Sequence, residues 1–272
     1  MEEAAAGRHS GDRSPLAQID GVWGSLAEST GPGLLAALRL ALERREFRLA
    51  YQPIVDLRSR RPVGIEALIR WPRMSIGPDV FIPIAERAGL IRDITRQVCR
   101  LAAEERITHR IADPVRLSIN LSAADARTLE TAALLSKLVQ ALGGPFLNVE
   151  LTERCLLESE RCGPVIRAIR AQGIQVHLDD FGTGYANLQA LVELTLDAVK
   201  IDHRLTRRVC DSRTAREVVL HLGRLAGTLG LSLTAEGVET EAQAHQLAEL
   251  GVQRAQGWLF GRPRFIEDCE DR

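Results

Sequence analysis

The sequence predicts an α/β protein that folds as a TIM-like (βα)8 barrel, and three observations carry this prediction. Eight short segments have the composition and length of β-strands. Most of them are separated by stretches with helical periodicity, and this alternation favours a parallel sheet, because parallel neighbours need a long crossover between them. Within the segments polar and apolar residues alternate, so each strand has one polar and one apolar face.

A half-exposed antiparallel sheet would show the same alternation within its strands. It would not need helices between those strands, so we favour the closed barrel. The predicted strands lie, in chain order, near residues 48–55, 63–70, 115–121, 147–152, 174–179, 196–202, 231–236 and 253–258.

Two of the predicted helices are well marked. Leu34, Leu38 and Leu42 recur at helical spacing and indicate an amphipathic helix that leads into the barrel. The clearest helix opens near Ser212 and stops at Gly230. Its expected capping box and apolar face consist of Thr214 with Glu217 and of Val218, Leu222, Leu225 and Leu229.

Composition bounds the number of domains. The chain has 272 residues, of which 45% are hydrophobic and 26% charged, so it can form one barrel-sized core or two small ones. Residues 1–32 are rich in Gly, Ser, Ala and charge and show no sustained period, which predicts a flexible leader or linker. Residues 33–272 are then the barrel domain.

Charge, hydropathy and cysteine content narrow the class of protein. Lys and Arg total 35 against 36 Asp and Glu, so no net charge draws the chain to DNA or to an acidic membrane. No apolar run is long enough for a membrane segment and the start lacks a secretory signal, which predicts a cytoplasmic protein. The five cysteines form no Cys-x-x-Cys pattern, so we expect buried, reduced thiols.

The polar faces of the predicted strands carry the chemistry. Glu150, for example, lies between the apolar residues Val149 and Leu151. If the polar faces point into the barrel, their side chains converge at one rim, where barrel enzymes place their active sites. The polar faces carry Glu66, Arg70, Ser118, Asn120, Glu150, Lys200, Asp202, Thr234 and Glu236.

Crowded carboxylates at such a rim call for a cation, because they otherwise repel one another. Neighbouring residues of a strand point to opposite faces, so Asp179 and Asp180 reach one site only if the strand ends there. Gly182 and Gly184 follow and allow a sharp turn, although an ordinary Asp-capped turn remains the alternative. Oxygen ligands without Cys or clustered His indicate Mg²⁺ or Mn²⁺.

From Tyr51 to Pro263 the chain resembles the EAL family of cyclic di-GMP phosphodiesterases. Several motifs in order at strand ends are a far stronger signal than any lone tripeptide. They are Glu66-Ala67-Leu68, Asn120-Leu121-Ser122, Glu150-Leu151-Thr152-Glu153, Asp179 through Gly184, Lys200-Ile201-Asp202, Ala235-Glu236-Gly237-Val238-Glu239 and Gln256-Gly257. The resemblance implies an EAL-type barrel that hydrolyses cyclic di-GMP to linear pGpG in bacterial second-messenger signalling.

The resemblance also implies a cofactor and the roles of single residues. It implies two Mg²⁺ or Mn²⁺ ions, the second held by Asp179 and Asp180. It makes Glu236 the general base and Lys200 the group that positions the attacking water or the metal ligands, with a plain salt bridge as the alternative for Lys200. The implied ligands of the first ion are Glu66, Asn120, Glu150 and Asp179.

Further predicted site residues surround these acids. Arg70 shares a strand face with Glu66, and its guanidinium suits two-point contact with a phosphate. Glu153 is implied to anchor the loop that holds Asp180, although a surface position is the alternative. The full set comprises the substrate contacts Gln52, Arg70, Asp202 and Gln256 and the supporting acids Glu153 and Glu239.

Three positions depart from the family pattern or lie outside its motifs. Only residues 72–77 stand where the family usually has a longer loop, and we expect this to bear on substrate access or turnover rather than on the metal ligands. The family prefers an aromatic residue within the segment that reads His203-Arg204-Leu205 here. His177 shares the parity of Asp179 and is expected inside the barrel, hydrogen-bonded to a neighbour.

Two other functions compete with hydrolysis. A catalytically weak or inactive module would bind cyclic di-GMP and signal to a partner protein, but such modules commonly lose the acids that this chain retains. An unrelated metal-dependent barrel enzyme would share the fold without the motifs. The resemblance also implies a homodimer that assembles near the loop after the fifth strand, and a regulatory or sensory partner protein.

Overall fold

The structure is a computed structural model that describes residues 31–74, 76–109, 115–181 and 194–269. The predicted leader therefore lies almost wholly outside the described residues. Its last two positions, Gly31 and Pro32, belong to the first turn of helix α2, Gly31–Arg44. Helical structure thus begins inside the predicted linker, which suits a proline because the first turn of a helix needs no N–H from it.

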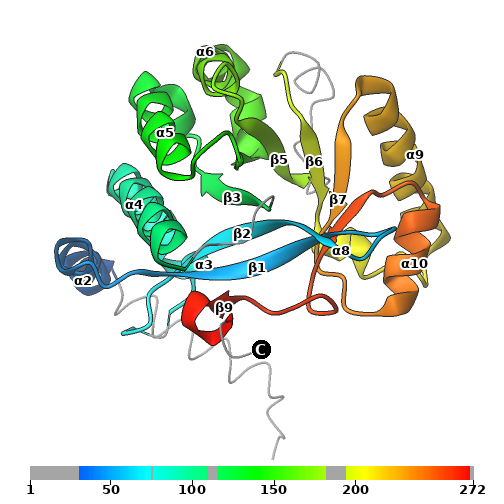
Figure 1. The fold of residues 1–272 in the computed structure, drawn as a ribbon, viewed down its shortest axis with the longest axis horizontal. Helices are drawn as coiled ribbons and strands as arrows, with labels where there is room; N and C mark the ends of the chain where they lie inside the picture. Colours follow the sequence, from blue (N-terminus) through cyan, green and yellow to red (C-terminus); the bar gives the residue numbers. More distant parts are fainter. Residues whose placement is uncertain (1–30, 75, 110–114, 182–193, 270–272) are drawn as a thin grey trace, which may run out of the picture.

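Eight strands close into a barrel, as predicted (Figure 1). The sheet order is β2-β3-β4-β5-β6-β7-β8-β1, and the pairing of β1 with β2 completes the ring. A short further strand, β9, Arg264–Phe265, adds to β1. The barrel strands are β1 Arg48–Asp56, β2 Pro62–Arg70, β3 Arg116–Leu121, β4 Leu147–Thr152, β5 Gln175–Phe181, β6 Ala198–Ile201, β7 Ser232–Ala235 and β8 Arg254–Gln256.

The sheet is not parallel throughout. Neighbours from β2 to β8 are parallel, whereas β1 runs antiparallel to both β2 and β8. The cause is the connection, because residues 57–61 are too few for a helical crossover and β1 and β2 form a hairpin. The Ser59 N–H donates to Asp56 Oδ1 at 2.7 Å within this turn. The prediction of a parallel sheet therefore fails for β1.

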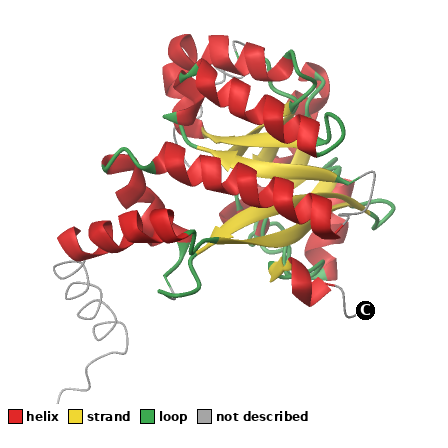
Figure 2. Cartoon of the chain, turned by 60° about the vertical axis from the view of Figure 1, so that its left-hand side comes forward, coloured by secondary structure: helices red, strands yellow, loops and turns green. Residues whose placement is uncertain are grey.

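Helices cover the outside of the barrel (Figures 1 and 2). Contacts join α4 to β1 and β2, α6 to β5, and α9 to β7. In the part of the chain that the structure describes, no helix combines the length and apolarity needed to cross a membrane. The helices after α2 are α3 Pro78–Arg87, α4 Ile91–His109, α5 Leu129–Ala141, α6 Ser159–Arg170, α8 His203–Thr206, α9 Arg213–Leu229 and α10 Glu241–Glu249, with 3-10 turns at Asp125–Arg127, Glu153–Glu158 and Ile266–Cys269.

The two faces of the strands differ as their alternation predicts. Val149 and Leu151 belong to the apolar core, which lies between the strands and the helices. Glu150, between them in the sequence, is also buried, at 1% exposure, on the opposite face. The barrel interior is therefore lined by buried polar groups, which include Gln52, Glu66, Ser118, Asn148, Glu150, His177, Lys200, Thr234 and Gln256.

Helix α9 forms where predicted but with a different cap. Ser212 is the N-cap, and its Oγ accepts a hydrogen bond from the Ala215 N–H at 3.2 Å. The capping box expected from Thr214 and Glu217 therefore does not form, because Thr214 already lies inside the helix. Gly230 ends the helix with φ of 70°, the left-handed conformation that glycine adopts without steric cost.

The apolar face of α9 also differs from the prediction. Val218 and Leu229 are exposed, at 42% and 38%, whereas Val219 and Ala226 are buried. Leu222 packs against the core as expected. Periodicity indicates that an apolar stripe exists, but the side of a broad stripe that meets the barrel depends on tertiary packing.

The four described thiols match the prediction of reduced cysteines with one exception in burial, and the side chain of Cys269 lies outside what the structure describes. Cys99, Cys155 and Cys162 are free and buried. Cys210 is also free but exposed, just before α9, so the prediction of buried thiols is wrong at this position.

The short connection after β2 is packed against the start of the domain. Trp71 pairs with Ile76 in an isolated antiparallel bridge. The Trp71 ring lies 5.5 Å from that of Phe47 and 6.0 Å from that of Phe81, measured between centroids. Aromatic contacts of this kind hold the loop to α3. Its effect on substrate access stays a prediction.

Candidate active site

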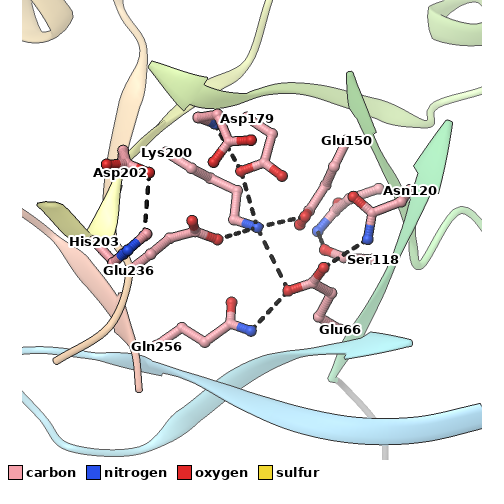
Figure 3. A network of polar contacts seen from close by, with 12 residues as sticks. Glu66, Ser118, Asn120, Glu150, Asp179, Lys200, Asp202, His203, Glu236 and Gln256 are labelled. Carbon is pink, nitrogen blue, oxygen red and sulfur yellow. Dashed lines mark hydrogen bonds and ion pairs between the residues drawn. The ribbon is translucent and has the colours of Figure 1, made fainter. Parts of the chain in front are cut away.

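One buried lysine stands at the centre of the barrel mouth (Figure 3). Lys200 is 1% exposed, and its Nζ lies 2.5 Å from Glu150 Oε2 and 2.6 Å from Glu236 Oε1. Asp179 Oδ1 lies 3.4 Å and Glu66 Oε2 3.5 Å from the same nitrogen. Four strands and the loop after β7 thus bring four carboxylates around one ammonium group, with more negative charge than it can neutralise.

Amide side chains hold Glu66 from two sides. Asn120 Nδ2 donates to Glu66 Oε1 at 2.6 Å, and Gln256 Nε2 donates to Glu66 Oε2 at 2.7 Å. Gln256 Nε2 also lies 2.9 Å from Gln52 Oε1, and Gln52 Nε2 donates to the Gly261 carbonyl at 3.0 Å. These bonds fix the position of the Glu66 carboxylate, because both of its oxygens have partners.

The protonation of the cluster follows from burial and charge. Burial alone would raise the pKa of Glu66, but Lys200 and the two amides offset it and hold this pKa below its ordinary value. Burial and then the charge of Glu66 raise the pKa of Glu150 well above its ordinary value. Burial would lower the pKa of Lys200, but the surrounding carboxylates raise it well above its ordinary value. Lys200 therefore stays charged.

Asp179 and Asp180 are brought together by an irregularity in β5. The strand continues to Phe181, but its pairing with β6 shifts between Leu178 and Phe181. Asp180 has φ of 56°, a left-handed conformation that is uncommon outside glycine and clusters at functional sites. The predicted end of the strand at Asp179 is therefore wrong, because a bulge rather than a strand end turns Asp180 beside its neighbour. Gly182 and Gly184 lie outside the described residues.

Glu236 directly follows β7 and is held by its backbone. Its N–H donates to the Ile201 carbonyl at 3.1 Å. Gly237 comes next with φ of 65°, and a Cβ at this position would lie 2.6 Å from His203 Cβ, so this turn requires glycine. Burial raises the pKa of Glu236 to about 8, although Lys200 opposes the shift. A carboxyl with such a pKa can take up and release a proton near neutral pH.

The arrangement fits a divalent cation. Asp179, Asp180 and Glu236 each offer a carboxylate oxygen, and the three oxygens lie within 4.8 Å of one another. Burial and the charge of Asp179 raise the pKa of Asp180, which shows that these acids repel each other. Asp179 and Glu236 also contact the Lys200 ammonium, as do Glu66 and Glu150. Hard oxygen donors with excess negative charge are what Mg²⁺ and Mn²⁺ prefer.

Two grooves open onto the cluster. The larger, of about 430 Å³, is lined by Arg70, Asp180 and apolar side chains of α3 and α4. The smaller, of about 310 Å³, is lined by Glu236 and Gln256 among others. Glu66 lines both grooves, so the carboxylates lie where the two meet. This suits a ligand whose reacting centre lies between two bulky ends.

The other predicted site residues lie at the rim. Asp202 caps α8, since its Oδ1 accepts from the Arg204 N–H at 2.9 Å and from Arg204 Nε at 2.7 Å. Glu153 is buried, at 5% exposure, and starts the 3-10 turn after β4. Glu239 lies in the smaller groove, with its Oε1 3.6 Å from Arg207. These three acids thus contact the surroundings of the cluster rather than Lys200.

Sequence reasoning missed an aromatic residue at the rim. Trp258 is 54% exposed, lines the smaller groove, and carries the Arg262 guanidinium 4.0 Å from its ring centroid. An exposed aromatic face with a cation behind it is a platform for a planar ligand group. The available signal was its place directly after Gln256-Gly257. A large aromatic residue next to a site motif is a candidate for the rim of the same site.

Three comparisons place this geometry among known proteins. The model of the EAL domain family matches residues 35–263. A cyclic di-GMP phosphodiesterase of Pseudomonas aeruginosa is 36% identical over 247 residues, which is 88% of this chain and 42% of that protein. A probable cyclic di-GMP phosphodiesterase of Escherichia coli, PdeB, is 35% identical over 85% of this chain and 45% of its own length. The chain thus spans less than half of these curated relatives.

A solved structure agrees with the sequence comparison. The phosphodiesterase PaMucR, in complex with c-di-GMP, superposes with a TM-score of 0.80 at 32% identity, over 87% of this chain and 99% of that one. The barrel described here is therefore shared with a phosphodiesterase that holds this nucleotide.

Proposed function

The chain belongs to the EAL domain family, and from this premise we propose that it hydrolyses cyclic di-GMP to linear pGpG as a metal-dependent phosphodiesterase. The observation that carries the proposal is the cluster around Lys200, because four buried or half-buried carboxylates meet one ammonium group at the barrel mouth. Relatives named as cyclic di-GMP phosphodiesterases support the substrate. The sequence retains an acid at each metal or base position that the family resemblance assigns to an acid.

The proposed cofactor is a pair of Mg²⁺ or Mn²⁺ ions. Asp179 would serve both ions and Asp180 the second, and the proximity of their oxygens to Glu236 supports this. When bound, such ions lower the pKa of a water molecule and offset the charge that develops on the phosphate. The proposed ligands of the first ion are Glu66, Asn120, Glu150 and Asp179.

Two residues are proposed to act on the reacting atoms. Glu236 takes the proton of the attacking water, and its raised pKa of about 8 supports this role because a base should have a pKa near the working pH. Lys200 donates hydrogen bonds from the centre of the cluster and keeps Glu236 and Glu150 in fixed positions. A hydrolysis step needs both, since a base acts only when it is held within reach of the water.

The substrate is proposed to lie across the junction of the two grooves. Arg70 lines the larger groove and would bind a phosphate oxygen pair. Gln52 and Gln256 lie on the side of the smaller groove, and Asp202 would contribute from the start of α8. Supporting roles are proposed for Glu153 and Glu239. Two grooves that meet at the carboxylates suit a cyclic dinucleotide, which carries a base on each side of its phosphates.

The test of this function is hydrolysis by the purified chain. Cyclic di-GMP is incubated with the protein and Mg²⁺ or Mn²⁺, and pGpG is followed by chromatography, with a chelator as one arm. The Glu66→Ala variant should lose activity, whereas Glu241→Ala, at an exposed surface ion pair, should keep it. Tight binding without pGpG would favour a binding module that signals to a partner. If the chain neither binds cyclic di-GMP nor produces pGpG, then cyclic di-GMP is not its substrate.

Assembly and cellular context belong to the same proposal. We expect a homodimer, as the family resemblance implies, but the loop after β5 lies outside the described residues. If dimerisation organises the site, specific activity should rise with protein concentration, and a monomer with constant specific activity would contradict this. A cytoplasmic location and a regulatory or sensory partner protein stay predictions of the sequence.

A further inference from the structure

A small, narrow cavity lies beneath the carboxylate cluster, inside the barrel. Glu150 and Lys200 form its upper wall, and His177, Thr234, Arg254 and Ile54 line the rest. The space open to the centre of a water molecule is about 10 Å³. A cavity needs roughly 10–15 Å³ by this measure to hold one water molecule, so it has room for a single small occupant.

Two residues that line this cavity each have a buried polar atom with no hydrogen-bond partner among the described residues. These atoms are Glu150 Oε1 and His177 Nε2, and their side chains are only 1% and 3% exposed as residues. Glu150 and His177 are register partners on β4 and β5, so they point to the same side of the sheet as neighbours. A buried polar atom without a partner is destabilising, and native proteins rarely leave two on neighbouring residues.

The charges around the cavity select a neutral occupant. A metal ion would meet Arg254 and the ammonium of Lys200, and an anion would meet the Glu150 carboxylate. An imidazole nitrogen can donate or accept a hydrogen bond, and water can bond to it in either case.

We propose that this cavity is a binding site for one water molecule, which bridges Glu150 Oε1 and His177 Nε2. The water completes the hydrogen bonding of Glu150, whose Oε2 is already held by Lys200 at 2.5 Å. His177 is then a positioning residue, because it fixes the carboxylate plane of Glu150 from below through the water. The effect on metal binding rests on the proposed function, in which Glu150 is a ligand of the first ion.

Calorimetric titration with Mn²⁺ tests the positioning role without any turnover. Removing such outer partners of a metal ligand typically weakens metal affinity 10–100-fold. His177→Leu should raise the Kd for Mn²⁺ about tenfold. His177→Gln should restore it to within about twofold of wild type, because the end of the glutamine side chain can replace Nε2 as a water partner. Ile54→Val is the matched control, since it enlarges the same cavity without removing a polar atom, and it should bind as wild type does.

Other patterns of affinity overturn the positioning role. If His177→Leu binds Mn²⁺ like wild type, His177 does not act on Glu150. If His177→Gln is as weak as His177→Leu, then the ring acts by packing alone. A wild-type chain that binds no Mn²⁺ would reject the proposed function instead, and the water site would then be judged separately.

A high-resolution crystal structure of the wild-type chain tests the water directly, whatever the variants do. We expect density for one water molecule about 2.7–3.2 Å from both Glu150 Oε1 and His177 Nε2. A dry cavity, or a direct hydrogen bond between the two side chains, would overturn the proposal. This measurement also decides the matter if His177→Leu fails to fold.

Discussion

The mouth and the floor of this barrel are built from charges of opposite sign. At the carboxyl ends of the strands, Glu66, Glu150, Asp179 and Glu236 surround Lys200. At the opposite ends, β3 and β8 begin with Arg116 and Arg254, and His177 lies between the two layers. The interior of one barrel thus changes from acidic to basic along its axis.

The two regions differ in how their charges are satisfied. Arg116 donates to Asn148 Oδ1 at 2.7 Å and to the Leu147 carbonyl at 3.0 Å, so neutral groups share its charge. At the mouth, several carboxylates surround a single lysine, so an excess of negative charge is buried there. The charge of Arg116 is thus shared by neutral acceptors, whereas the charges of the mouth are not balanced, a pattern that clusters at functional sites.

The largest effect is expected at Glu236. Replacing it with Gln keeps the size of the side chain but removes the proton acceptor, so kcat for cyclic di-GMP should fall by about 10²–10⁴-fold with binding retained. Steady-state kinetics and nucleotide titration measure the two quantities. Near-normal turnover would show that Glu236 is not the base, and the mouth would then lack its proposed catalytic group.

The next effect is the loss of stability on replacing Lys200 with Met in the presence of a chelator. Removing one partner of a buried ion cluster costs about 3–5 kcal/mol, because the carboxylates lose the ammonium group that they share. Urea denaturation measures it, and saturating Mn²⁺ should restore part of the loss.

An exposed ion pair supplies the control for Lys200. Arg60 contacts Glu241 at 2.6 Å, and the two side chains are 41% and 73% exposed. Arg60→Met should therefore change the free energy of unfolding by less than about 1 kcal/mol. Equal losses in the two variants would show that the buried position of Lys200 has no special importance.

Much of this architecture could be predicted from the sequence. All eight barrel strands follow from local composition, and the period of two forces Glu66, Glu150 and Lys200 onto one face. The direction of β1 was not recognised, although the short connection at 57–61 determines it, because alternation within a strand says nothing about direction.

The rest of the site depends on tertiary structure. The left-handed conformation of Asp180 arises from a register shift with β6, which no local pattern encodes. The pKa of Glu236 depends on burial by segments far away in the sequence. The cavity below Glu150 exists only because the barrel closes. Sequence therefore predicts which side chains face inward but not their distances or protonation.

The dependence of stability on pH should separate the mouth from the floor in metal-free protein. Glu236 has a pKa of about 8 when folded against an ordinary 4.5, so between these values the folded state binds more protons and its stability falls as pH rises. His177 has a pKa of about 3 in the folded state against an ordinary value of 6.5. The unfolded state therefore binds more protons between these values, and the contribution of His177 to stability rises with pH up to 6.5.

Urea midpoints measured in chelator should therefore fall from about pH 6.5 to 8, where the contribution of His177 is already complete. Glu236→Gln should make this part of the profile less steep, with Glu150 and Asp180 still contributing, and His177→Leu should leave it unchanged. A wild-type midpoint that stays level across this range would show that the acids of the mouth are not strained by burial.

The smallest effect is expected for Arg254→Met, which removes the same charge from the floor as Lys200→Met removes from the mouth. Burial lowers the pKa of Arg254, and its charge also lowers the pKa of Arg116, so removing it relieves both penalties. The substitution also removes a favourable attraction, because Asp56 stabilises the charged form of Arg254 and raises its pKa. These opposing changes should leave the free energy of unfolding within about 1 kcal/mol of wild type.

Turnover of Arg254→Met should change less than threefold, since the bridging water keeps Glu150 and His177 as partners. Urea denaturation and kinetics of both variants, measured side by side, test the comparison. If Arg254→Met costs as much as Lys200→Met, the floor needs its positive charge as much as the mouth does.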